Sequence, residues 1–266
     1  MSPFRKHASP AAIATEAASL RWLAAVIPDG GAPVVPLLAT GDGWLETERL
    51  AVGRPGTGDA EEFGRRLAAT HAAGARWWGE APPGLDPEES RLAELVQPAF
   101  ARGEDAPGGW GEFYAEHRVR PYLQKGVDRG ELGGAALRDV EATLARVADG
   151  EFDAPQPEGC GAVARIHGDL WGGNLLWAAR DDGGADGTLI DPAAHGGHAE
   201  TDLAELALFG SPLLERTLAG YNEAAPLAPG WRERVGIHQL HMLSVHVALF
   251  GGGYAAQLEA VARRYA

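Results

Sequence analysis

The segment 165–177, RIHGDLWGGNLLW, constrains the fold and the chemistry of this chain more than any other. It places His167, Asp169 and Asn174 in a run that is otherwise mainly apolar or glycine. Asp and Asn are common turn formers, so one interpretation is a structural turn between two strands. The other is a catalytic loop that presents polar groups at fixed intervals. The rest of the sequence favours the catalytic loop.

Phosphoryl transfer needs few protein groups. One carboxylate accepts the hydroxyl proton of the acceptor, and a second carboxylate with an amide oxygen holds Mg²⁺ against the nucleotide phosphates. Kinases supply these groups as H-R-D-L-x-x-x-N, followed by a metal-binding Asp on the next strand. Residues 167–174, HGDLWGGN, fit this pattern except that Gly168 replaces the Arg. Asp191 follows the apolar run 188–190, where the metal-binding Asp is expected.

The N-terminal part of the chain predicts a small mixed unit. Residues 4–7 can form a strand, and Ser9 with Pro10 reads as the start of a helix that reaches about Val26. Two strands are then expected over 34–38 and 44–50, joined by the turn TGDG. A Gly/Pro-rich linker over 54–58 follows.

The remainder is expected to be mainly helical. Asp59 is expected to cap the first of these helices, and residues 74–86 read as a surface loop. The catalytic segment interrupts the helices with a strand pair joined by the turn DDGGADG. The predicted helices span 59–73, 88–100, 110–125, 132–148 and several stretches from Glu200 to the end, and the predicted strands span 174–178 and 188–190.

Composition excludes several classes of function. The formal charge of -14 argues against nucleic acid and anionic membranes as partners, because both need basic patches. Cys160 is the only cysteine, which rules out an internal disulfide and a cysteine-based zinc site. The chain begins without an apolar signal region and has no run long enough for a membrane span, so a cytoplasmic location is expected.

The sequence resembles the fructosamine kinase (ketosamine 3-kinase) family, a branch of the protein-kinase-like small-molecule kinases. The resemblance is carried by RIHGDLWGGNLLW and LIDPAAHGGHAETDLAELALFG, and Trp171 after HGDL separates this branch from aminoglycoside and choline kinases. WGEFYAEHRVRPYL, EAASLRWL and VHVALFGGGY extend the similarity over nearly the whole chain. It implies an α+β, two-lobed protein-kinase-like fold. A small, N-terminally truncated β-rich lobe would cover 1–52, and a larger, mainly helical lobe would cover 53–266.

The resemblance also implies a function for each matching residue. Asp169 would accept the proton, and Asn174 and Asp191 would hold Mg²⁺. Lys6 would contact the phosphates of ATP and pair with Glu16 on the following helix. Without the downstream motif, Lys6 and Glu16 would read only as a solvated ion pair.

Further residues are implied to bind the nucleotide or to support the site. The backbone of Glu48, Arg49 and Leu50 would form the hinge that hydrogen-bonds adenine. Asp202 would cap the helix near Glu200 and brace the catalytic loop. The supporting or substrate-contacting residues would be His167, Trp171, His195, His198 and Asp202.

Histidine pairs offer a competing interpretation as metal ligands. His195 and His198, like His238 and His241, have i, i+3 spacing. His238, His241 and His246 lie on an apolar helical stretch, which favours core or groove histidines. For His195 and His198, the position beside Asp191 allows a substrate contact.

Two departures from the family pattern bear on activity. Only residues 1–5 precede Lys6, so the glycine-rich hairpin that covers the phosphates in this family is missing. Either the true start lies upstream, or ATP binds weakly under an open lid. Gly168 stands where regulated protein kinases have an Arg that pairs with a phosphate, so switching by phosphorylation is not expected.

The segment after Asp191 indicates the size of the acceptor. It is short and lacks the A-P-E motif of peptide-docking protein kinases, which favours a small molecule. The leading hypothesis is an ATP- and Mg²⁺-dependent kinase for a sugar hydroxyl of a small ketosamine. The alternatives are a kinase for an aminosugar, amino alcohol or similar metabolite, and a non-catalytic nucleotide-binding relic. The sequence leaves the oligomeric state open, with a monomer slightly favoured.

Overall fold

The computed structural model describes residues 3–266, which form two compact units. The first unit comprises the chain up to Glu104 together with Gln156–Ala228, and the second comprises Asp105–Pro155 and Pro229–Ala266. The expected lobe boundary at residues 52 and 53 lies inside the first unit, and it remains a prediction. Within residues 3–266, no helix combines the length and the apolar character needed to cross a membrane.

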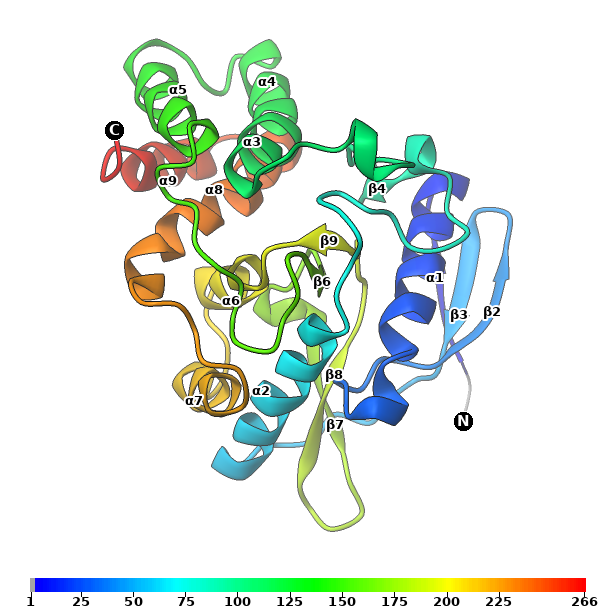
Figure 1. Ribbon diagram of the computed structural model, residues 1–266. Coiled ribbons are helices and arrows are strands. Elements are labelled where there is room, and N and C mark those ends of the chain that lie inside the picture. The colour runs from blue at the N-terminus through cyan, green and yellow to red at the C-terminus, as the bar shows by residue number, and fades with distance from the viewer. Residues whose placement is uncertain (1–2) are drawn as a thin grey trace. The chain divides into compact units, whose positions relative to one another are not determined.

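A three-stranded antiparallel sheet opens the first unit, in the order β1-β3-β2 (Figure 1). Its strands are β1 (Phe4–His7), β2 (Leu37–Gly41) and β3 (Trp44–Thr47). Helix α1 (Pro10–Ala24) follows β1 and packs against the sheet. Ser9 caps it, because its side chain accepts a hydrogen bond from the amide of Ala12 (3.3 Å). The predicted strand–helix–strand order of this region is confirmed.

The second predicted strand begins later than expected, because Pro36 interrupts it. Val34 and Val35 pair instead with the end of a different strand, where the amide of Val35 donates to the carbonyl of Leu189 (3.0 Å). Proline has no amide hydrogen to continue a ladder, so β2 starts at Leu37.

The rest of the first unit combines three helices with three two-stranded antiparallel sheets, of which β4–β5 and β7–β8 are hairpins. The helices are α2 (Thr57–Ala72), α6 (Ala199–Leu208) and α7 (Leu214–Ala224). The strand pairs are β4 (Arg91–Leu92) with β5 (Leu95–Val96), β6 (Ala164–Ile166) with β9 (His195–Gly197), and β7 (Leu175–Ala179) with β8 (Ala185–Leu189). Short 3₁₀ turns are η1 (Ile27–Asp29), η2 (Pro87–Glu89), η3 (Gly103–Asp105) and η5 (Gly172–Asn174).

Helices α2 and α7 pack backbone against backbone. A Cβ at Gly64 would lie 2.1 Å from the carbonyl oxygen of Thr217, and one at Gly220 would lie 2.0 Å from that of Glu61. Both glycines are therefore needed for this close approach. Helix α2 also contacts β6 and β8.

The second unit is helical throughout its regular structure (Figure 1). Its helices are α3 (Trp110–Tyr114), a π-helical turn η4 (Ala115–Val119), α4 (Arg120–Asp128), α5 (Gly134–Ala148), α8 (Trp231–Phe250) and α9 (Gly253–Ala262). The hydroxyl of Tyr114 accepts from the amide of His241 (3.0 Å) and donates to the carbonyl of His238 (2.7 Å). Tyr114 thus joins α3 to α8, and both histidines are buried in this unit.

Two local predictions were wrong. Residues 88–100 form η2 and the β4–β5 hairpin instead of a helix, because the hairpin is held by contacts to α1 that its own sequence does not reveal. Asp59 is not the cap of α2, which begins two residues earlier. Gly56 is the cap, and Asp59 reaches back to accept a hydrogen bond from its amide (2.8 Å).

Candidate active site

The loop between β6 and β7 brings Asp169 and Asn174 together. The side-chain amide of Asn174 donates to the carboxylate of Asp169 (2.9 Å) and to its backbone carbonyl (2.8 Å). The backbone amide of Asn174 in turn donates to the carbonyl of Trp171 (2.9 Å), which closes the turn at η5. The five-residue spacing seen in the sequence therefore produces a fixed carboxylate–amide pair.

His167 ties this loop to the segment that carries Asp191. Its Nδ1 accepts from the amide of Asp169 (3.2 Å), and its Nε2 lies 2.9 Å from the carbonyl oxygen of Ile190. A carbonyl can only accept, so His167 is the neutral tautomer with the proton on Nε2. Burial lowers the pKa of His167, which is consistent with this neutral form.

Helix α6 supplies two acids that hold the loop from behind. The carboxylate of Asp202 accepts from the amides of His167 (2.7 Å) and Gly168 (3.0 Å), and Glu205 accepts from that of Leu170 (3.1 Å). The contact of Asp202 with the loop follows the prediction, but its assignment as a helix cap was wrong. His198 caps α6, and Asp202 lies inside the first turn.

Sequence reasoning missed Glu205, although its i, i+3 spacing from Asp202 on one helix face was the available signal.

Asp202 is also held by His71 of α2, whose Nε2 lies 3.1 Å from the carboxylate. The other ring nitrogen of His71, Nδ1, contacts the hydroxyl of Tyr221 (2.8 Å). Burial alone would raise the pKa of Asp202. The hydrogen bonds from His71 and the loop outweigh burial and keep the pKa of Asp202 below its usual range.

The environment of Asp169 makes it a stronger base than a solvated carboxylate. Removal from solvent raises the pKa of Asp169 well above its usual value, while the hydrogen bond from Asn174 opposes this rise. A carboxylate that is more basic takes up a proton more readily, as a general base must. A cation near Asn174 and Asp191 would counteract the rise and favour the ionised form.

Lys6 lies between Glu16 and Asp191. Its ammonium nitrogen is 2.8 Å from the carboxylate of Glu16 and 3.2 Å from that of Asp191. Burial would lower the pKa of Lys6, but the two carboxylates outweigh it and raise the pKa. Burial also raises the pKa of Glu16, against the opposing effect of Lys6. The predicted proximity of these three residues is present in the structure.

Asp191 and Asn174 fit the requirements of a magnesium site. Asp191 has left-handed backbone geometry (φ 52°), which is costly for a non-glycine residue and frequent at functional sites. Its side chain remains 45% exposed. Because Nδ2 of Asn174 donates to Asp169, its Oδ1 is the atom that can face a cation. Carboxylate and amide oxygens are the ligands that Mg²⁺ prefers.

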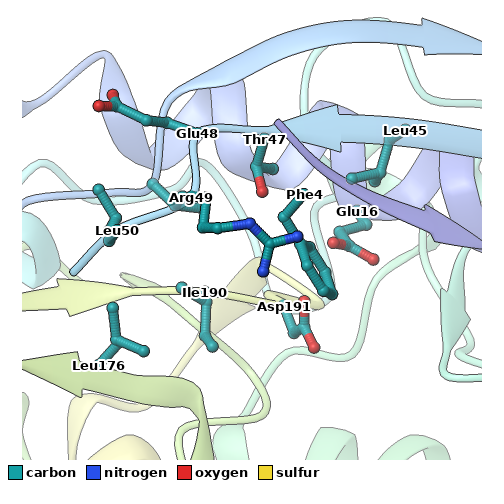
Figure 2. Close-up of a pocket in the computed structure, with 11 residues that line it drawn as sticks. Phe4, Glu16, Leu45, Thr47, Glu48, Arg49, Leu50, Leu176, Ile190 and Asp191 are labelled. Atoms are coloured by element: carbon teal, nitrogen blue, oxygen red, sulfur yellow. The ribbon is translucent and has the colours of Figure 1, made fainter. Parts of the chain in front are cut away.

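A cavity of about 250 Å³ adjoins Asp191 and is mainly apolar (Figure 2). Glu48, Arg49 and Leu50, which were expected to form a hinge, line it. The guanidinium of Arg49 extends over the ring of Phe4, 5.6 Å from the ring centre. The other lining residues are Glu16, Val35, Leu45, Thr47, Leu176, Ile190 and Asp191. The amide of Glu48 already donates to Pro36 (2.9 Å), so base recognition would fall to other backbone groups of the hinge.

A second cavity, of about 340 Å³, is lined by Asp169 and Asn174. It shares Glu16 and Asp191 with the first cavity and extends past Asp169 to Trp171. The ring of Trp171 lies against Gly173, where a Cβ would approach it to 2.1 Å. The rings of Trp171 and Phe209 are nearly perpendicular, with their centres 6.2 Å apart. The indole is thus held from two sides while it lines the cavity.

The predicted site residues His195 and His198 are buried and have no contact with the Asp169–Asn174 pair in the hydrogen bonds described above. They are 2% and 1% exposed and line neither of the two cavities. His195 Nδ1 contacts the carbonyl of Ala193 (3.1 Å), and His198 caps α6. A substrate contact by either residue therefore gains no support from the geometry. Conversely, Phe4, Leu176 and Ile190 line the apolar cavity and were not predicted, since apolar strand residues read as ordinary core.

Comparison with solved structures confirms the predicted α+β kinase-like fold. The choline kinase of Streptococcus pneumoniae superposes with a TM-score of 0.55 over 98% of this chain, at 13% identity and with 84% of its own chain covered. At that identity the likeness concerns the fold alone. The candidate fructosamine-3-kinase of Thermobifida fusca is nearer, with a TM-score of 0.79 and 42% identity, covering 94% of this chain and 78% of its own.

Relatives known from sequence agree. A probable ketoamine kinase of Synechocystis is 28% identical over 85% of this chain and 69% of its own length. The mouse ketosamine-3-kinase is 32% identical over 54% of this chain and 43% of its own length. The chain therefore spans only part of the curated relatives it matches. The model of the family described as fructosamine kinase matches residues 4–265, and the chain belongs to the fructosamine kinase family.

Proposed function

We propose that the chain is an ATP-dependent kinase that phosphorylates a sugar hydroxyl of a small ketosamine. Lys6, Glu16, Asp169, Asn174 and Asp191 form what we call the phosphoryl-transfer cluster. The observation that carries the proposal is that all five residues of this cluster line one cavity, and that a second, apolar cavity adjoins it at Glu16 and Asp191. The apolar cavity has the size and lining that a purine requires. Membership of the fructosamine kinase family supports the same chemistry.

In this proposal Asp169 accepts the proton of the acceptor hydroxyl while the hydroxyl oxygen attacks the γ-phosphorus of ATP. The bond from that phosphorus to the bridging oxygen breaks, and ADP leaves. Asn174 holds Asp169 in one orientation through the 2.9 Å hydrogen bond. Mg²⁺, when held by Asn174 and Asp191, would neutralise phosphate charge during the transfer. Lys6 would steady the phosphates.

The residues that line the two cavities suggest where adenine and the acceptor would bind. Adenine would lie among Phe4, Leu176 and Ile190 with the backbone of the hinge along its edge. The acceptor would enter past Trp171, whose held indole face suits the apolar side of a sugar ring. A cytoplasmic location, where ATP is available, and a monomeric state complete the proposal.

A screen of ATP consumption across glycated lysine, ribulosamines, aminosugars and amino alcohols tests this function. We expect Mg²⁺-dependent consumption with at least one ketosamine, and a product heavier by one phosphoryl group in mass spectrometry. Preference for an aminosugar or amino alcohol would shift the substrate class while retaining the kinase. Absence of turnover with every acceptor, despite measurable Mg·ATP binding, would favour a non-catalytic binding protein.

A further inference from the structure

The cavity beside Asp169 carries one acidic side chain that the phosphoryl-transfer cluster does not include. Outside the cluster, its charged lining residues are Arg91 and Glu94 of the β4–β5 hairpin. The guanidinium of Arg91 donates to the carbonyls of Glu88 and Ser90, both at 2.9 Å, so it is turned toward the base of its own hairpin. Glu94 is exposed at the tip of the hairpin, on the cavity wall.

The position of Glu94 is fixed relative to helix α1. One of its carboxylate oxygens accepts from the amide of Ser9 at 3.0 Å. The amide of Arg91 donates to the hydroxyl of Thr15 (3.0 Å), which fastens the other side of the hairpin to the same helix. Ala93 adopts left-handed geometry (φ 51°) at the tip, a strained conformation that the two anchors maintain.

Because α1 also carries Glu16, these anchors hold Glu94 at a constant place beside the phosphoryl-transfer cluster. Hydrogen bonds from Ser9, with a smaller effect of the Arg91 charge, hold the pKa of Glu94 below its usual range, so the side chain keeps its negative charge at neutral pH. The wall facing an incoming acceptor therefore presents a fixed carboxylate. A cation entering the cavity gains from such a partner, whereas a neutral molecule does not.

We propose that Glu94 binds the protonated amine of the acceptor and thereby selects ketosamines over neutral ketoses. The inference rests on the proposed function, because it takes the acceptor hydroxyl to lie at Asp169. In a ketosamine the amine nitrogen is separated from the ring hydroxyls by only a few bonds, so both groups occupy the same cavity. Glu94 is the acidic group there that neither pairs with Lys6 nor serves as the proposed base.

The test compares two acceptors of the same length that differ at one position, where one has a protonated amine and the other a neutral ether oxygen. One is a 1-alkylamino-1-deoxyfructose, and the other is the fructose 1-O-alkyl ether of equal chain length. The variants are Glu94→Gln and the matched control Glu88→Gln, which removes the same charge from the neighbouring η2 turn outside the cavity. We expect Glu94→Gln to raise KM for the amine roughly 10- to 100-fold with little change in kcat, and to leave KM for the ether unchanged. In Glu88→Gln, KM for both acceptors should equal that of the wild type.

Several outcomes would overturn the inference. Equal losses for amine and ether would mean that Glu94 only anchors the hairpin, and unchanged KM for both would remove any contribution. Glu94→Asp keeps the charge but shortens the reach to Ser9, so it should retain much of the amine preference even if the hairpin loosens. If Glu94→Asp lost that preference but turned over the ether normally, a negative charge at position 94 would not be enough to select the amine. That result would contradict the assignment.

Failure of the proposed function would be recognised separately. If the wild-type protein phosphorylates neither acceptor, calorimetric binding of the amine and the ether to wild type and Glu94→Gln still decides the inference. Weaker binding of the amine alone in Glu94→Gln supports it. Equal binding of the amine to both proteins overturns it, whatever the catalytic result.

Discussion

Gly168, in the loop 167–174, occupies a position where the backbone geometry requires glycine. Its φ of 78° lies in the left-handed region, and a Cβ there would approach the carbonyl oxygen of Ala193 to 2.4 Å and Nδ1 of His195 to 2.7 Å. The sequence presents Gly168 only as the absence of a regulatory Arg. The structure adds that no side chain fits at this position without displacing the strand β9 region.

Replacing Gly168 with alanine should therefore destabilise the protein more than backbone conformation alone explains. Gly183 is the matched control, because it has a similar φ of 85° with nothing within 4 Å of a Cβ. We expect Gly183→Ala to cost about 1 kcal/mol in the free energy of unfolding. Gly168→Ala should cost about 2 kcal/mol more because of the overlap. Equal losses in urea denaturation would show that the loop accommodates the Cβ.

Individual site residues were predictable to the extent that the chemistry is local in sequence. Asp169 and Asn174 sit on one loop, so their spacing alone indicated the pair. Phe4 and Leu176 were not predictable, because an apolar residue that lines a pocket has the same sequence pattern as one in a core. Glu205 was missed because its spacing from Asp202 was the one local signal, and its partner, the amide of Leu170, lies on a distant segment of the chain.

Among the secondary-structure elements, the side chain of Asp59 links the start of α2 to the β7–β8 hairpin by hydrogen bonds, beside the packing of Phe63 on Trp177. The carboxylate of Asp59 accepts from the amide of Gly56 (2.8 Å), and its other oxygen accepts from Arg180 of the hairpin (2.9 Å). The hydrogen bond from Gly56 contributes most to keeping the pKa of Asp59 below its usual value. The first turn of α2 and the hairpin that leads to Asp191 are therefore coupled.

Asp59→Ala should lower the free energy of unfolding by about 1 kcal/mol, which is typical for loss of a helix-start hydrogen bond. The melting temperature should fall by roughly 2–4 °C. Asp182→Ala is the control, since Asp182 pairs with the same Arg180 without reaching α2. Because the pKa of Asp59 is lower in the folded protein, its carboxylate contributes fully to stability above the usual pKa of 3.8 and loses this contribution as the pH falls below it. The difference in free energy of unfolding between wild type and Asp59→Ala should therefore shrink on acidification. A difference that grows on acidification would contradict this linkage.

At the scale of elements, the predictions were correct for α1, whose start depends on neighbouring residues in the sequence. They were wrong for residues 91–96, whose structure depends on contacts with residues far away in the sequence. Ser9 and Pro10 mark the start of α1 by local capping, and the structure agrees. Residues 91–96 form a hairpin because Thr15 and Ser9, far away in sequence, bind it. Such tertiary contacts override helical periodicity and are invisible to a local pattern.

Across the first unit, the chain gathers distant segments around Asp191. β1 brings Lys6, α1 brings Glu16, and β8 leads into Asp191, which contacts both cavities. The order of these groups along the chain was predictable from the family resemblance. The cavities themselves, and the share that the β4–β5 hairpin takes in one of them, required the three-dimensional arrangement.

Asp191→Ala should abolish Mg²⁺-dependent nucleotide binding and leave the fold intact. Its side chain is 45% exposed and adds little to packing, so the melting temperature should change by no more than about 2 °C. Calorimetry of Mg·ATP binding, with Asp42→Ala at the β2–β3 turn as a control, measures the effect. Unchanged Mg·ATP affinity in Asp191→Ala would remove this residue from the metal site.

The central claim is that Asp169 accepts the proton of the acceptor hydroxyl. Asp169→Asn keeps the shape of the side chain but cannot take up that proton. Turnover should fall roughly 10²- to 10⁴-fold, the usual contribution of a general base. Mg·ATP affinity should barely change, because the proposed metal ligands are Asn174 and Asp191.

The decisive measurement is turnover and melting temperature of Asp169→Asn on the same preparation as wild type. The melting temperature should stay equal or rise slightly, since the variant removes one carboxylate from a cluster of acids and relieves the cost of its burial. We predict a stable protein that has lost its turnover. A destabilised protein with near-normal turnover would contradict the account and make Asp169 a structural turn residue.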